Sequence, residues 1–171
     1  MSSNARDKRK RTHMALEHYE RGPAARRIRS ARERLGLSDE AFAAKFGFKD
    51  WYHDLEAYDD DVFMAISLRQ LGQLADALRL TPLGIVAPTD PPVVKPISMS
   101  DVVKALSFHM AQRSETPDSL SARVGWELAG ALENAECAWN EWNVDCLQDV
   151  SREIEVSWMG VLASWPAGCA A

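Results

Sequence analysis

One pattern of residues occurs twice in the chain, and this repeat constrains the fold more than any other feature. Residues 38–48 read SDEAFAAKFGF and residues 116–126 read TPDSLSARVGW, so capping, apolar, basic and glycine positions coincide at a separation of 78 residues. Residues 66–86 match residues 142–162 in the same way at a separation of 76. Segments that share apolar spacing and turn residues predict two copies of one small helical unit.

Helix signals run through both copies and no alternating strand pattern occurs, so the sequence predicts an all-α fold. Ser38 and Ser67 are good N-cap residues, and Gly47 is a good helix stop. Five helices are expected in the first copy, over 24–34, 38–46, 48–58 (ending in the run Asp59–Asp61), 67–78, and a short one opened by Thr81-Pro82.

Four prolines within residues 88–96 exclude a helix there and predict an extended connection. The expected organisation follows the chain: a basic N-terminal arm over 1–22, a first domain over 23–87, a Pro-rich linker over 88–99, a second domain over 100–166, and a tail over 167–171.

Charge is distributed unevenly along the chain. Residues 1–34 hold 11 Lys and Arg against 4 Asp and Glu, whereas residues 35–171 hold 9 against 21. This polarity predicts either an arm that binds phosphate or an arm that folds against the acidic remainder, and both interpretations stay open.

The composition indicates a cytoplasmic protein that is not an enzyme. No apolar run reaches the ~18–20 residues of a membrane span, and the three cysteines lack paired spacing, as expected for reduced thiols. The four histidines have no metal-ligand spacing, and there is no phosphate loop or nucleophile elbow. We therefore expect no catalytic residues, metal or cofactor.

A longer pattern covers residues 24–87 of the first copy. Its members occur in the order Ile28, Arg32, Leu35-Gly36-Leu37-Ser38, Phe42-Ala43, Gly47, Leu55-Glu56, and Leu71 through Leu78. This order resembles the phage-repressor/Cro-type (XRE) helix-turn-helix family, which implies two lambda-repressor-like five-helix units in tandem, the second degenerate. The resemblance also implies a structural ion pair between Arg32 and Glu56; the alternative is that both are solvated helix charges.

In that family the second helix crosses the phosphate backbone and the third presents side chains to bases in the major groove. The resemblance therefore implies DNA contacts from the third helix, whose reader positions are Lys49, Asp50, Trp51, Tyr52 and Asp54. Other candidate DNA contacts are the cap residue Ser38 and the cations Arg26, Arg27, Arg29, Lys45, Arg9, Lys10 and Arg11. Two departures weaken this prediction: the third helix is one residue short, and Asp50 and Asp54 would approach a polyanion.

The second copy departs further from the family pattern. Met110 replaces the equivalent of Arg32, and residues 126–136 contain three glutamates and no basic residue. We do not expect this copy to contact DNA. Trp139 and Trp165 have no counterpart in the first copy, so they are candidates for a protein interface. Burial in the core is the alternative for both.

Two functions remain open. The first is a transcriptional regulator that binds double-stranded DNA as a homodimer, with the first copy as reader and the second as dimerisation or partner module. The alternative is a protein-interaction regulator on a scaffold that no longer reads DNA, such as an antitoxin, an anti-activator or a phage or mobile-element control protein.

Overall fold

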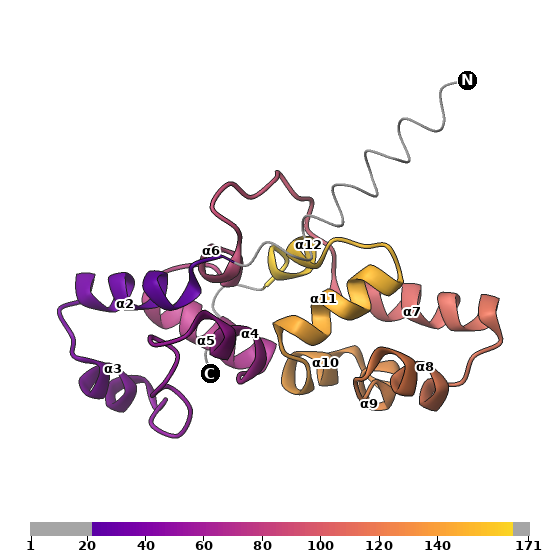
Figure 1. The fold of residues 1–171 in the computed structure, drawn as a ribbon, viewed down its shortest axis with the longest axis horizontal. Helices are drawn as coiled ribbons and strands as arrows, with labels where there is room; N and C mark the ends of the chain where they lie inside the picture. Colours follow the sequence, from indigo (N-terminus) through magenta and orange to yellow (C-terminus); the bar gives the residue numbers. More distant parts are fainter. Residues whose placement is uncertain (1–21, 166–171) are drawn as a thin grey trace.

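The computed structural model describes residues 22–165, which fold into helices and turns without a β-strand (Figure 1). The all-α class predicted from the sequence is confirmed. The first half, residues 22–87, contains α2 (Ala24–Arg34), α3 (Asp39–Phe46), α4 (Asp59–Met64), α5 (Leu68–Leu78) and α6 (Pro82–Val86). The second half, residues 99–165, contains α7 (Met99–Arg113), α8 (Pro117–Val124), α9 (Ala129–Glu133), α10 (Ala135–Glu141), α11 (Val144–Glu153) and α12 (Trp158–Leu162). None of these helices is long and apolar enough to cross a membrane.

Side-chain caps start the helices of the first half where the sequence indicates. Ser38 Oγ accepts a hydrogen bond from the N–H of Ala41 at 3.2 Å and begins α3. Ser67 and Gln70 form a reciprocal capping box that begins α5. The apolar face of α5 is fully covered, which makes this helix the centre of the first half; its buried residues include Leu68, Leu71, Leu74, Ala75 and Leu78.

The backbone of the two halves matches at unusual positions. Among the described residues, those with a positive φ form three pairs: Gly36 (69°) with Ser114 (53°), Gly47 (76°) with Gly125 (81°), and Arg79 (58°) with Glu155 (56°). The first two pairs are 78 residues apart and the third is 76 apart, as in the sequence repeat. Helices α3 and α8 both end at a glycine because a residue without Cβ adopts this conformation at little cost.

The N-caps of the two halves match as well. Each cap side chain accepts the backbone N–H three residues further on. The caps of α3, α5 and α6 are Ser38, Ser67 and Thr81, and those of α8, α11 and α12 are Thr116, Asn143 and Ser157. Five helices of the first half therefore have counterparts in the second: α2 with α7, α3 with α8, α4 with α10, α5 with α11, and α6 with α12.

Residues 48–58 do not form the third α-helix that the sequence predicts. They form two separate turns, one closed by a hydrogen bond from Tyr52 N–H to the Phe48 carbonyl (3.0 Å) and the other by a bond from Ala57 N–H to the Asp54 carbonyl (2.9 Å). The prediction of a continuous helix was wrong at this segment, which we call the turn segment.

The turn segment is held by burial and not by helix propensity. Aromatic residues and Asp, which make up much of it, are weak helix formers. Phe48, Tyr52 and Leu55 instead point into the core and are 6%, 2% and 1% exposed. These three buried side chains, together with Glu56 held by Arg32 and Arg29 of α2, fix the segment in this turned conformation.

The run Asp59–Asp61 begins α4 and does not end a helix, which also corrects the sequence-based expectation. Carboxylates are favoured in the first turn of a helix because they face its exposed N–H groups. Asp59 Oδ1 also accepts the backbone N–H of Ala25 at 2.8 Å, so this run fastens α4 to the start of α2.

The two halves pack against each other and share one hydrophobic core. Helix α5 contacts α10, α4 contacts α11, and α6 contacts α12. Two hydrogen bonds reinforce the junction: Leu68 N–H donates to the Trp142 carbonyl at 2.8 Å, and the side-chain Nδ2 of Asn143 donates to the Met64 carbonyl at 2.8 Å. In Figure 1, α6 and α12 lie near the centre of the molecule, whereas α2 and α7 lie toward opposite ends.

The Pro-rich residues 88–98 contain no helix and connect α6 to α7 around the outside of the junction (Figure 1). The end of this segment is attached to the second half, because Ile97 N–H donates to the Gly160 carbonyl at 2.9 Å. The segment therefore joins halves that already touch.

Candidate functional site

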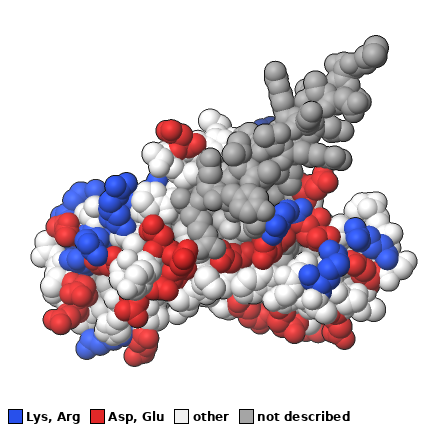
Figure 2. Space-filling model, viewed as in Figure 1, with Lys and Arg blue, Asp and Glu red and all other residues white. Residues whose placement is uncertain are grey.

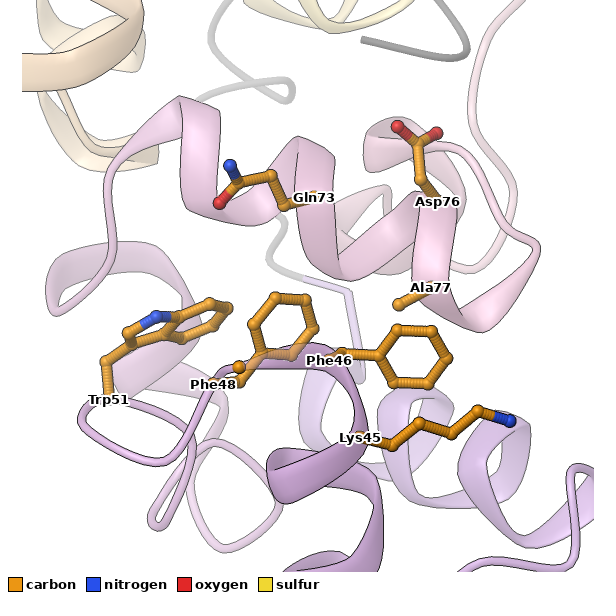
Figure 3. Close-up of a pocket in the computed structure, with 8 residues that line it drawn as sticks. Lys45, Phe46, Phe48, Trp51, Gln73, Asp76 and Ala77 are labelled. Carbon is orange, nitrogen blue, oxygen red and sulfur yellow. The ribbon is translucent and has the colours of Figure 1, made fainter. Parts of the chain in front are cut away.

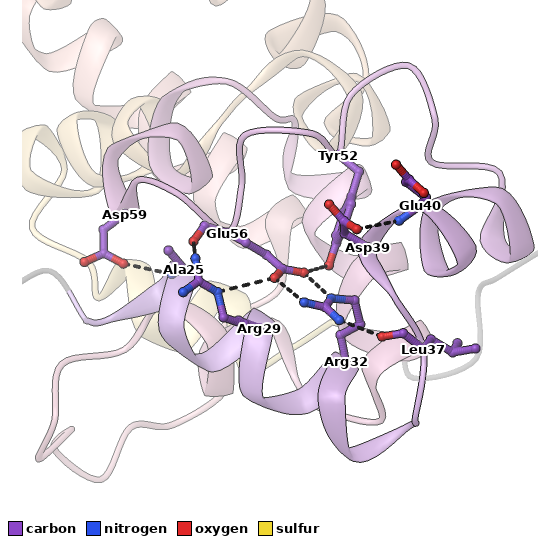
Figure 4. Close-up of polar contacts among 9 residues, drawn as sticks. All are labelled: Ala25, Arg29, Arg32, Leu37, Asp39, Glu40, Tyr52, Glu56 and Asp59. Atoms are coloured by element: carbon purple, nitrogen blue, oxygen red, sulfur yellow. Dashed lines mark hydrogen bonds and ion pairs between the residues drawn. The ribbon is translucent and has the colours of Figure 1, made fainter.

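An ion-pair network fastens the turn segment to α2 (Figure 4). Arg32 Nε donates to Glu56 Oε1 at 2.5 Å and Arg32 Nη2 donates to Oε2 at 2.7 Å, which is a two-point guanidinium–carboxylate contact. The hydroxyl of Tyr52 also donates to Oε1, and Arg29 Nη2 donates to the carbonyl of Glu56 at 2.6 Å. Arg32 Nη1 reaches the Leu37 carbonyl at 2.6 Å, which ties the loop before α3 to the same network.

The network shifts the pKa values of Glu56, Tyr52 and Arg32. Burial alone opposes ionisation of Glu56, but the hydrogen bonds from Arg32 and Tyr52 outweigh it and lower the pKa of this carboxyl below its usual value. Burial, followed by the bond to Glu56, raises the pKa of Tyr52, and the bond to Glu56 raises the pKa of Arg32. The pair is therefore ionised and Tyr52 is neutral near neutral pH.

This lowered pKa makes the stability of the protein depend on pH. A carboxyl whose pKa is lower in the folded state stabilises fully above its unfolded pKa of about 4.3, and that contribution is lost as pH falls through the folded value. We expect Glu56→Gln to reduce the free energy of unfolding at pH 7, and the difference from the wild type to shrink below about pH 4. Urea titrations from pH 3 to pH 7 measure this. Glu40→Gln, at an exposed site, is the matched control, and a difference independent of pH would contradict the prediction.

Two candidate DNA contacts are engaged inside the protein, which corrects the sequence-based interpretation. Arg27 donates to the carbonyls of Ile85 (3.0 Å) and Ala87 at the end of α6, and burial lowers its pKa. Tyr52 is 2% exposed and its hydroxyl binds Glu56. Both side chains are therefore engaged by polar groups of the fold.

The remaining candidates have mixed surroundings. Arg26, Lys45, Lys49 and Asp50 are exposed, whereas Trp51 is half-buried and packs on Phe48 at a ring distance of 4.5 Å. Arg29 is exposed but bound to Glu56, and Ser38 is occupied as the cap of α3. Arg9, Lys10 and Arg11 lie outside the described residues. On the turn segment, exposed Asp50 and Asp54 outnumber the single exposed lysine.

The second half presents an acidic edge along α9 and α10, formed by the exposed residues Glu127, Glu133, Glu136 and Glu141 (Figure 2). All four cations of residues 99–165 form ion pairs with other acids: Lys104 with Asp101, Arg113 with Glu115, Arg123 with Glu115 and Glu153, and Arg152 with Asp149. Within the described part of the chain, only Glu136 of the acidic edge pairs with a cation, Arg69 at 3.2 Å. The edge therefore keeps most of its negative charge.

Trp139 and Trp165 do not form an exposed interface, so this prediction is also corrected. Trp139 is 6% exposed, and its ring meets Trp165 edge-on with the centroids 5.1 Å apart. The Trp165 ring lies directly over Gly72, where a Cβ would come within 2.1 Å of it. The two tryptophans pack on each other, and through Trp165 they contact α5 of the first half.

Comparisons with known proteins add no assignment: no family model, no curated protein and no solved structure matches this chain.

A pocket of about 530 Å³ lies between the end of α3, the turn segment and α5 (Figure 3). Its aromatic side is formed by Phe46, Phe48 and Trp51, and Gln73 and Ala77 contribute from α5. The sequence reasoning missed this pocket. Its signal was the cluster of three aromatic residues within six positions, Phe46, Phe48 and Trp51.

Proposed function

We propose that the protein is a regulator built from two lambda-repressor-like units in tandem, joined by a Pro-rich linker, and that it acts by binding a positively charged protein partner. The matched caps and the matched positive-φ residues support the tandem arrangement. The partner, and not DNA, is favoured by one observation above all: no helix stands between α3 and α4 in the place of the groove-reading helix.

A helix in the major groove is how a helix-turn-helix domain reads bases, through side chains at its exposed start. The turn segment instead buries Tyr52 and exposes Asp50 and Asp54 beside Lys49. Bases are read mainly by Arg, Lys, Asn and Gln. Sequence-specific reading of DNA by this segment is therefore disfavoured both by its shape and by its side chains.

The acidic edge supplies the complementary argument. Surfaces of one charge steer partners of the opposite charge and exclude like-charged ones. Glu127, Glu133, Glu136 and Glu141 repel a nucleic acid, whereas they attract a protein rich in Lys and Arg. An anti-activator or antitoxin that covers a basic functional surface fits this chemistry.

The test compares a charge-reversed variant with a matched control. The partner is recovered from cells of the source organism with tagged wild-type protein and then purified. For this partner we expect Glu133→Lys/Glu141→Lys to lower the association rate at least tenfold at low salt, because electrostatic steering is lost. Asp90→Lys/Glu155→Lys changes the net charge equally at exposed positions outside the edge and is expected to have little effect. Equal rates for both variants would exclude the acidic edge as the binding surface.

A second candidate function, DNA binding by the first half, is favoured by its exposed cations Arg26, Lys45 and Lys49. It predicts binding that is strongest at low salt, because phosphate contacts release counterions. A salt titration with a 30-base-pair duplex decides between the two proposals. We expect no sequence preference and weak binding at 20 mM salt; tight binding that discriminates between duplexes would favour the DNA reader.

A further inference from the structure

The contacts between the two halves are reciprocal. Helix α4 contacts α11 and α5 contacts α10. Since α10 is the counterpart of α4, and α11 that of α5, each of these contacts is the other with the halves exchanged. The third contact joins α6 to its own counterpart α12. Exchanging each helix for its counterpart in the other half therefore leaves this set of three contacts unchanged.

Two hydrogen bonds near the middle of the junction join matching parts of the two halves. Leu68 N–H binds the Trp142 carbonyl, and Trp142 occupies the position of Ile66 in the repeat. Asn143, the counterpart of the cap Ser67, binds the Met64 carbonyl from the other side. The start of α5 thus meets the start of α11, as positions near a two-fold axis must.

Reciprocal contact is the property that distinguishes a two-fold dimer interface from other packings. If residue i of the first unit touches residue j of the second, then residue j of the first unit touches residue i of the second. Two unrelated domains that merely collapse on each other have no reason to satisfy it. In Figure 1 the arrangement is visible as α6 and α12 near the centre, with α2 and α3 extending to one side and α7 and α8 to the other.

We infer that α4, α5 and α6 form a pairing surface for a matching five-helix unit, and that the second half occupies this surface as a built-in partner. The chain is then an internal dimer that is closed and monomeric in solution. This inference extends the tandem arrangement of the proposed function but does not depend on what the protein binds, since it concerns only how the halves recognise each other.

The exposed apolar side chains agree with a closed molecule. Among the described residues, the large hydrophobic side chains that are exposed are Tyr58, Met64, Val93 and Phe108. They lie at α4, in the Pro-rich segment and on α7. Single exposed apolar residues are ordinary on a soluble surface. The apolar area that a second chain would need is instead buried at the junction, where Leu68 and Trp142 are 0% and 1% exposed.

The internal pairing also changes what the two outer surfaces can do. In Figure 1, α3 of the first half and α8 and α9 of the second lie along the same side of the molecule. A symmetric dimer would present two identical surfaces there. This chain presents the turn segment on one half and the acidic edge on the other, so its combined surface fits an asymmetric partner.

The inference is tested on the full chain with a specific protease site inserted after Val93, which is fully exposed and precedes the attachment at Ile97. Before cleavage, we expect light scattering to give the mass of one chain, 19.1 kDa, from 5 to 200 µM. After cleavage, the two halves should elute together with the same total mass. They should also exchange with the halves of a tagged cleaved protein, because a pairing surface accepts an equivalent unit from another molecule.

Trp139→Ala and Phe108→Ala are compared in the same cleaved protein. Trp139 lies on α10, which contacts α5, and it supports the Trp165 ring over Gly72, whereas Phe108 is exposed. The first substitution should therefore raise the dissociation constant of the halves at least fiftyfold, and the second should leave it unchanged. An intact wild-type chain that forms dimers, or cleaved halves that separate at micromolar concentration, would overturn the inference. Cleaved halves that stay together but never exchange would equally count against it.

Discussion

Glu56→Ala is expected to lower the free energy of unfolding by about 3 kcal/mol, because it leaves the Arg32 guanidinium without its carboxylate in a site where both side chains are mostly buried. The Arg32 and Glu56 side chains are 12% and 11% exposed. The substitution also removes the acceptor of the Tyr52 hydroxyl, which is buried. Urea unfolding followed by far-ultraviolet circular dichroism measures the loss.

The control separates the loss of the pair from the loss of any glutamate. Glu40 is exposed at the start of α3, and Glu40→Ala is expected to change stability by no more than about 0.5 kcal/mol. The double variant Arg32→Met/Glu56→Leu replaces both charges by apolar groups and should recover much of the stability. A loss below about 1 kcal/mol for Glu56→Ala would mean that water already solvates the pair.

Trp139→Ala is expected to destabilise the whole chain by about 3 kcal/mol and to keep unfolding as a single transition. The Trp139 indole packs edge-on against Trp165, whose ring covers Gly72 of the first half, and the hydrophobic core is continuous through the junction. Its removal leaves a cavity beside the Trp165 ring that contacts the first half. Calorimetry is the appropriate measurement, because it counts transitions as well as their midpoints.

Phe108→Ala is the matched control, since Phe108 is an aromatic residue of the same half and is 64% exposed. It is expected to change stability by less than about 0.5 kcal/mol. Two separate transitions in the wild-type protein, only one of them moved by Trp139→Ala, would show that the halves fold independently and would contradict the shared core.

The helix ends were predictable from the sequence because local chemistry determines them. Ser38 and Ser67 cap helices as expected, and Gly47 ends α3 in the left-handed conformation. A cap requires only a side-chain oxygen and an N–H three residues away, so its signal is contained in four consecutive residues. The repeat places equivalent cap residues, Thr116 and Asn143, at the starts of α8 and α11 in the second half.

The turn segment was not predictable from the same signals. Phe48, Tyr52 and Leu55 have helical spacing, and that spacing favours a helix when it is considered alone. The outcome depends on distant partners, since Glu56 is bound by Arg32 and Arg29 from α2. A pattern of apolar residues does not report such partners, and for that reason the pocket beside Trp51 was missed as well.

The location of Trp139 and Trp165 required tertiary information for a related reason. Tryptophan is common both in protein interfaces and in cores, so its position in the chain does not decide between them. The structure packs the two rings on each other inside the molecule, with Trp165 against α5 of the first half, and does not present them to a partner. Gly72 is the residue that decides it, because only a position without a side chain leaves room for the Trp165 ring.

The separation between equivalent residues changes from 78 to 76 within one short stretch. Twelve residues, 47–58, lie between α3 and α4, whereas ten residues, 125–134, lie between α8 and α10. Helices α3 and α8 before this stretch, and α6 and α12 after it, keep matching ends. The scaffold thus behaves as a constant frame with one stretch of variable length in each half, and protein engineers have a defined place to vary exposed residues while the buried anchors Phe48, Tyr52 and Leu55 are kept.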